Sequence, residues 1–222
     1  MYRRGKQWKR QHILKKDGVR AIFLYLISCF YPVVSSVIIP YSTRNDVLTK
    51  TSQWVLPIIA IVVCLFLVKT EKRSFRTIGF TPIKSIRPIV ICIVGTIVMV
   101  GFEGLFYYVL KGKTHISSNF SNGLIALIML TAVIDEEISG RAYMQSRLRG
   151  FIENERVVLI IASFLFMLSH YPPYLVLGEL LSMSQVVILL VLGLVCGIQY
   201  NKTHNVLIPI ITHYIYNMVY FY

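Results

Sequence analysis

Long apolar runs recur along the whole chain, and they leave few architectures open to it. Seven nearly uncharged runs occur, each close to the ~20 residues that cross a ~30 Å hydrocarbon core as a helix. They cover residues 21–41, 52–68, 88–110, 123–139, 157–177, 185–200 and 206–222. The mean hydropathy of +0.64 agrees with this pattern. Because lipid cannot satisfy exposed backbone groups, we expect an all-α polytopic transmembrane helix bundle of about seven spans.

Basic residues are unevenly divided among the segments that connect these runs. If the N-terminus is cytoplasmic, the inner segments 1–20, 69–87, 140–156 and 201–205 hold 19 of the 23 Lys and Arg residues. The outer segments hold the other four. This asymmetry is typical of the positive-inside rule, so we predict a cytoplasmic N-terminus in a multi-pass protein of the cell membrane. The net charge of +13 then needs no nucleic acid as a partner, and membrane lipid is the expected surrounding.

The rest of the chain reads as one helical domain. Residues 1–20 form a basic cytoplasmic segment, and residues 21–222 form a single transmembrane domain without a Pro-, Gly- or Ser-rich linker. The prolines at 32, 57 and 172–173 predict kinks or helix ends. All four cysteines fall inside predicted spans without a C-x-x-C pattern, so we interpret them as core residues rather than disulfides or metal ligands.

The segment "VIDEEISGRAYMQSRL", residues 133–148, ends the fourth run in three carboxylates. Glu137 and Arg141 are four residues apart, which puts them on one helical face in a favourable order and predicts an ion pair. Glu136 is rotated by about 100° from Glu137 on a helix, so it remains available for chemistry. An interfacial charge cluster that only fixes the depth of the span explains the segment equally well. For residues 140–156 we expect an amphipathic stretch on the inner surface or a solvated connector.

Two further runs carry polar side chains. His170 follows Phe166 by one turn in "FMLSH", just before a Tyr-Pro-Pro break, and "HYIYN" places His213 and Asn217 on one helical face. Each could serve only in helix packing. Counting ~1.5 Å per residue from the cytoplasmic ends places Glu136 ~5 Å deep, His213 ~10 Å, Asn217 ~17 Å and His170 ~20 Å. All four can therefore line one cavity between the inner surface and the middle of the membrane.

These four side chains form a coherent hydrolytic set. A carboxylate held in a low-dielectric cavity is a candidate general base, and an adjacent histidine can share the proton. Donors from His and Asn can stabilise the oxyanion that develops when water attacks an amide carbonyl.

The motifs E-E-x-x-x-R at 136–141, F-x-x-x-H at 166–170 and H-x-x-x-N at 213–217 resemble those of the CPBP (CAAX protease and bacteriocin-processing, Abi) family over about residues 120–220. The resemblance implies a glutamate-dependent intramembrane endopeptidase that acts on a membrane-associated peptide or protein. It implies that Glu136 and His170 activate water and that His213 and Asn217 form the oxyanion site. Glu137, Arg141 and Phe166 would then be supporting residues.

The same resemblance raises the questions of whether the site holds a metal and what role the protein has in the cell. One Glu with two His is also a plausible zinc set, but the spacing is not H-E-x-x-H, so we favour a site without metal or other cofactor. The small size resembles the compact bacterial members, which implies the bacterial plasma membrane and bacteriocin leader processing or self-immunity rather than CAAX processing.

Two other functions compete with this interpretation. A non-catalytic bacteriocin immunity or partner-binding membrane protein would keep the same helices without hydrolysis. A small transporter or channel would use the buried ionisable residues, with Glu103 as another candidate. We rank the transporter low because Glu103 lies toward the outer end of its run, where exposure or a local ion pair explains it.

Overall fold

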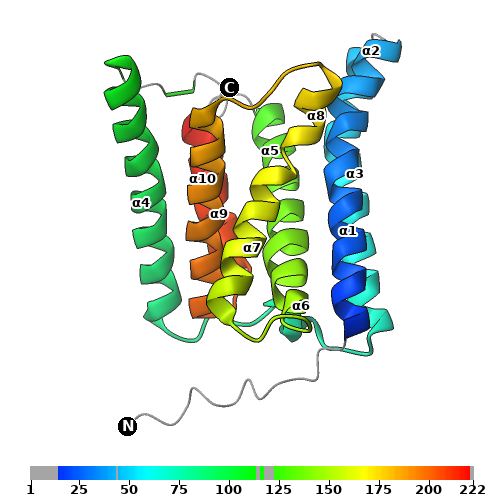
Figure 1. Ribbon diagram of the computed structural model, residues 1–222, viewed down its shortest axis with the longest axis vertical. Helices are drawn as coiled ribbons and strands as arrows, with labels where there is room; N and C mark the ends of the chain where they lie inside the picture. Colours follow the sequence, from blue (N-terminus) through cyan, green and yellow to red (C-terminus); the bar gives the residue numbers. More distant parts are fainter. Residues whose placement is uncertain (1–14, 44, 114–115, 118–122, 221–222) are drawn as a thin grey trace.

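The computed structural model describes residues 15–43, 45–113, 116–117 and 123–220, and across these residues the regular structure is entirely helical. The basic segment 1–20 is described only from Lys15, so most of that prediction lies outside the described residues. The main helices, drawn in Figure 1, are α1 (Lys15–Val33), α3 (Asp46–Thr70), α4 (Ile86–Lys111), α5 (Gly123–Glu136), α7 (Glu155–Leu168), α9 (Met183–Thr203) and α10 (Leu207–Tyr220). The predicted all-α bundle is confirmed.

Five helical stretches in the described part of the chain are long and apolar enough to cross a membrane. They are Lys15–Thr43, Asp46–Thr70, Ile86–Lys111, Glu155–Val176 and Met183–Thr203. Each contains most or all of one predicted run. The other two runs form α5 and α10, which have 14 residues each. The total of seven spans and the cytoplasmic side of the N-terminus therefore stay predictions.

The sequence suggested that the fourth run ends at its three carboxylates, but the helix continues beyond them. The helix continues without a break from α5 into the π-helix η4 (Glu137–Gln145) and the short α6 (Ser146–Leu148). Tyr143 and Arg147 on this continuation are 0% and 1% exposed, so the prediction of a surface stretch or solvated connector is wrong for residues 140–148. Counted from Leu148, Glu136 lies ~18 Å along the helix rather than ~5 Å from its end.

This continuous helix is central to the packing. η4 contacts α1, α3, α7 and α9, while α5 contacts α3 and α10 (Figure 1). A glycine allows the close crossing of α7 and α9, because a Cβ on Gly193 would come within 3.1 Å of the Ser163 backbone. Small residues at such crossings let helix backbones approach in lipid, where packing replaces the hydrophobic effect. All four cysteines are buried and free, as predicted for core residues.

The prolines mark irregular points in two of the three predicted places. Pro32 precedes a π-helical segment, η1 (Val34–Ile38), which leads into α2 (Ile39–Thr43). Pro172 and Pro173 open the short helix α8 (Tyr171–Val176) after α7 has ended at Leu168. Pro57 lies inside α3, which is assigned as one helix throughout.

A buried ion-pair cluster connects the continuous helix to its neighbours at the end of the bundle where α1 begins and α3 ends. Arg147 donates from Nε to Glu71 Oε2 at 3.0 Å, and its Nη2 lies 2.8 Å from the same oxygen. The Tyr143 hydroxyl donates to Glu71 Oε1 at 2.7 Å. Arg73 Nη2 lies 2.9 Å from Asp17 Oδ2 and links the cluster to α1. The cluster anchors one end of the continuous helix, and Glu136 lies near the middle of that helix.

Candidate active site

Three helical segments bring Glu136, His170 and His213 together in the middle of the bundle. Glu136 is the last residue of α5, His170 lies between α7 and α8, and His213 lies on α10. Glu136 Oε2 lies 3.9 Å from His170 Nε2 and 3.8 Å from His213 Nε2. Glu136 and His170 are partly accessible, with 26% and 29% of their side chains exposed, whereas His213 is 3% exposed. These three predicted site residues therefore share one location.

The second nitrogen of each imidazole is held by the protein. His170 Nδ1 lies 2.8 Å from the Phe166 carbonyl oxygen, and His213 Nδ1 lies 2.9 Å from Glu137 Oε1. A carbonyl or carboxylate oxygen accepts only, so each Nδ1 acts as the donor. Each Nε2 is therefore directed toward Glu136, with its ring orientation fixed from behind.

The break after α7 is what places His170. The helix begins at the Asn154 N-cap, whose side chain accepts from Arg156 N and Val157 N, and it ends at Leu168. Pro172 and Pro173 cannot continue an i to i−4 hydrogen-bond ladder, so a new helix starts after His170. The Ser169 hydroxyl and His170 Nδ1 both turn back to the Phe166 carbonyl.

Glu137 and Arg141 form the ion pair that their spacing predicted, and both are fully buried. Arg141 Nε lies 3.7 Å from Glu137 Oε2, and the Arg141 guanidinium stacks over the Phe166 ring at 4.1 Å from its centroid. Glu137 also accepts from His213, a contact the sequence analysis did not predict because 76 residues separate the two. Glu137 and Arg141 of the first motif thus contact His213 of the third motif and Phe166 of the second.

Replacing Phe166 with Leu should destabilise the protein by about 2 kcal/mol, because it removes a desolvated cation–π contact to Arg141. The free energy of unfolding in detergent, measured by thermal or denaturant titration, tests this. Phe164→Leu on the same helix is the matched control, since Phe164 is 49% exposed and its loss should change stability little. Equal effects of the two substitutions would contradict the role of the stacking contact.

Asn217 is not brought into this group by any hydrogen bond or ion pair in the described residues. It lies one turn beyond His213 on α10 and is half-buried. Tyr216, its neighbour, packs toward His213 with ring centroids 6.5 Å apart. The structure thus places Asn217 near the site without giving its side chain a partner there.

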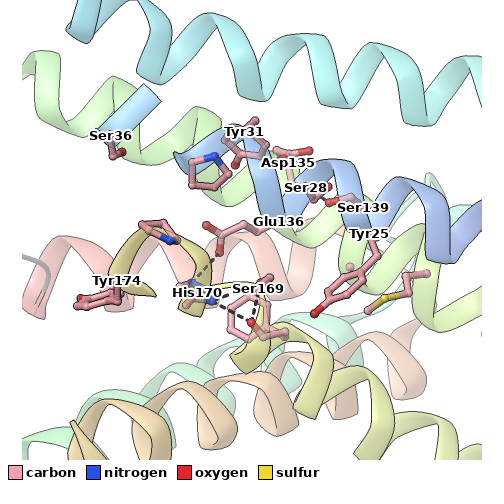
Figure 2. Close-up of a pocket in the computed structure, with 15 residues that line it drawn as sticks. Tyr25, Ser28, Tyr31, Ser36, Asp135, Glu136, Ser139, Ser169, His170 and Tyr174 are labelled. Carbon is pink, nitrogen blue, oxygen red and sulfur yellow. Dashed lines mark hydrogen bonds and ion pairs between the residues drawn. The ribbon is translucent and has the colours of Figure 1, made fainter. Parts of the chain in front are cut away.

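A cavity of about 280 Å³ opens beside Glu136 and His170. Its walls come from α1, η1, the α5–η4 junction and the end of α7 with α8. Figure 2 shows Glu136 facing His170, with Asp135, Tyr31 and Ser28 close by. The cavity reaches Ser36 and Tyr174 in the direction of α2 and α8, and it reaches Tyr25 and Met144 in the direction of α6 and the start of α1. His213 and Asn217 are not among its lining residues.

Helix α1 contributes to this cavity, which the sequence motifs did not predict. Tyr25, Ser28 and Tyr31 recur at three-residue spacing, which puts polar side chains on one face of the first run. That polar stripe is the signal that could have identified α1 as part of the site.

Glu103 lies in the second half of α4, but it is buried rather than exposed. It is 4% exposed on the face of α4 that packs against α10, beside Tyr216 and Tyr220. The prediction that exposure explains this residue is therefore wrong. It remains apart from the cavity at Glu136, because it is not among the lining residues.

Within the described residues, no three His, Cys, Asp or Glu side chains are arranged to hold a metal ion.

Comparison with known proteins agrees with the motifs. Residues 118–219 match the family model described as type II CAAX prenyl endopeptidase Rce1-like, which belongs to the CPBP family of membrane proteases. No curated protein and no solved structure matches the chain significantly. The matched residues include α5, α7, α9 and α10, and all three motifs fall within them. Residues 118–219, which carry Glu136, His170 and His213, are therefore similar to the Rce1-like family of membrane endopeptidases, and the match does not extend to the helices before them.

Proposed function

We propose that this protein hydrolyses peptide bonds of a membrane-associated peptide or protein, with Glu136 and His170 activating the attacking water. The observation that carries the proposal is the position of Glu136. Its Oε2 faces two imidazole Nε2 atoms within 4 Å, borders a cavity and has no hydrogen-bond partner in the described residues. An otherwise unpaired carboxylate beside a histidine is the arrangement that general-base catalysis requires.

The distance between Glu136 and His170 suits a water between them. Because His170 donates from Nδ1 to the Phe166 carbonyl, the Nε2 of the neutral ring is an acceptor, as is the Glu136 carboxylate. Two acceptors 3.9 Å apart are too distant for a direct bond but can each accept one proton of a shared water. The lone pairs of that water then remain free to attack a carbonyl carbon, while Glu136 takes the proton.

His213 and Asn217 are proposed as the oxyanion site. His213 Nδ1 donates to the buried Glu137, which fixes the orientation of the ring. A charged His213 would donate from Nε2 toward an oxyanion formed next to Glu136. Asn217 lies on the same helical face and adds an amide donor once a substrate draws the two together. His213 is as close to Glu136 as His170 is, so it also lies within reach of the transferred proton.

We propose that the reaction uses no metal. The motifs lack the H-E-x-x-H spacing of zinc proteases, and Glu136, His170 and His213 can complete a proton path without a metal. For the substrate we propose a bacteriocin leader peptide, or a toxin against which the producer protects itself. The resemblance to compact bacterial CPBP members supports this choice.

Replacing His170 with Gln should lower kcat/KM by about 10²-fold or more, because Gln cannot share the proton of the activated water. The assay uses protein purified in detergent and candidate leader peptides, with new termini identified by mass spectrometry. His204→Asn is the matched control, since His204 lies in the α9–α10 turn with positive φ, which Asn tolerates. Cleavage that survives His170→Gln unchanged, or that a chelator abolishes, would contradict the proposed mechanism.

A further inference from the structure

Asp135 is a buried carboxylate that the proposed hydrolysis does not use. It precedes Glu136, lines the same cavity and is 0% exposed. Neither of its oxygens has a hydrogen-bond partner in the described part of the structure, and the same holds for the hydroxyl of Ser28 beside it. Buried polar groups are nearly always paired, and an unpaired carboxylate within a membrane bundle is costly. The donor that Asp135 lacks among the described residues is therefore expected to come from a ligand.

Tyr31 is the neighbour best placed to relieve Asp135, and it is not sufficient. Its ring lies next to Asp135 on the wall of the cavity (Figure 2). A phenol hydroxyl has one proton to donate, whereas a carboxylate has two oxygens with about four acceptor positions. Even with its hydroxyl turned toward Asp135, Tyr31 leaves at least one oxygen without a donor. The Ser139 hydroxyl is also close to Asp135, but it donates its one proton to the main-chain carbonyl of Asp135.

The charge of the cavity limits what that ligand can be. The charged-type side chains that line it are Asp135, Glu136 and His170, and no Lys or Arg is among the described lining residues. The nearest arginine along this helix, Arg141, is committed to Glu137 and to the ring of Phe166. The cavity therefore offers acceptors for a cation and lacks a cation that would hold a free carboxylate.

The remaining walls suit the stem of a long cationic side chain. Tyr25, Tyr31 and Tyr174 supply aromatic surface, and Ser28 supplies a further acceptor. Lys and Arg bury their aliphatic stems against such surface, and their charged groups are attracted to aromatic faces. A volume of about 280 Å³ holds one such side chain and not a folded segment of the substrate.

We propose that this cavity binds a Lys or Arg side chain of the substrate next to the scissile bond, with Asp135 as its counter-ion. This assignment rests on the proposed function, because Glu136 is taken as the base that cuts the adjacent bond. Asp135 is then a specificity-determining residue that pairs with substrate and takes no part in proton transfer.

The first experiment measures cleavage. Internally quenched peptides are given to the wild-type protein in detergent, with one position at a time occupied by Lys, acetyl-lysine, norleucine or Glu. We expect kcat/KM at one position to be about 30-fold higher for Lys than for acetyl-lysine, in keeping with the loss of one partner of a desolvated charge pair. Asp135→Asn should abolish this preference while it still cuts the acetyl-lysine peptide. Asp46→Asn, at an exposed position at the start of α3, should retain the preference.

The second experiment measures binding without cleavage. The Glu136→Gln protein in phosphatidylcholine nanodiscs is titrated with a fluorescent peptide that carries Lys or acetyl-lysine at the selected position. If the first experiment detects no cleavage, each position is titrated in turn. Tighter binding of the Lys peptide, lost on adding Asp135→Asn, supports the cation site independently of catalysis.

The two experiments separate failure of the inference from failure of the proposed function. Cleavage that depends on Glu136 but shows no preference for Lys overturns the role of Asp135 and leaves the hydrolytic proposal intact. Lys-selective binding without any cleavage by the wild-type protein overturns the hydrolytic proposal and keeps Asp135 as a cation site. Absence of both overturns both.

Discussion

Replacing Glu136 with Gln should lower kcat/KM for peptide cleavage by about 10³-fold, within the range of 10²–10⁴ typical of a lost general base. Gln keeps the size of the side chain but cannot accept the proton of the water shared with His170. The cost should appear mainly in kcat, because the carboxylate acts in the transition state rather than in substrate binding. Steady-state kinetics on a defined peptide, with matched unfolding curves in detergent, measures both quantities.

Two comparisons make this result specific to Glu136. Glu179→Gln, at an exposed position in the loop between α8 and α9, should leave the kinetics unchanged. Thermal unfolding of Glu136→Gln should match that of the wild-type protein, since the carboxylate is 26% exposed and has no hydrogen-bond partner at Oε2 in the described residues. Full activity of a folded Glu136→Gln protein would exclude Glu136 as the base.

Replacing Arg147 with Met should lower the free energy of unfolding by about 3–5 kcal/mol, the cost of breaking a buried ion pair from one side. Arg147 and Glu71 are each 1% exposed at their side chains, and the substitution leaves the Glu71 carboxylate with a weaker set of donors. Denaturant unfolding of the purified protein in detergent measures the change. The expected loss is large because the cluster joins α3 to the helix that carries Glu136.

Arg76→Met provides the control for this measurement. Arg76 is exposed in the short 3₁₀ helix η2 (Phe75–Ile78), near the same end of the bundle, and its loss should change stability by less than about 0.5 kcal/mol. A double replacement of Glu71 and Arg147 by apolar residues should recover part of the loss, because neither charge is then left alone. Equal stabilities of Arg147→Met and Arg76→Met would show that the buried cluster contributes little.

Much of the bundle could be predicted because its helices are set by local composition. Apolar runs of sufficient length gave the five candidate spans and α5 and α10, and the i, i+4 rule gave the pairing of Glu137 with Arg141. The prediction of where the fourth run ends was wrong for a physical reason. Charges normally mark a membrane boundary, but Arg141 and Arg147 are neutralised by Glu137 and Glu71 and so remain buried.

The site itself could be predicted only in part. The three motifs supplied Glu136, His170 and His213, which the structure brings together. The distance of ~5 Å from Glu136 to the end of its helix was too short, because the helix continues to Leu148, ~18 Å away. The cavity depends on α1, and the contact between His213 and Glu137 depends on tertiary packing. No local pattern encodes which faces of distant helices meet.

The two histidines differ in what evolution can change around them. His213 takes its orientation from a side chain, so a single codon change at Glu137 would release it. His170 takes its orientation from the main-chain carbonyl of residue 166, and every amino acid supplies that oxygen as long as the helix reaches Leu168. A substitution at position 166 can therefore alter the packing on Arg141 without releasing His170. A change in where α7 ends would instead turn the His170 ring away from Glu136, although the histidine itself is unchanged.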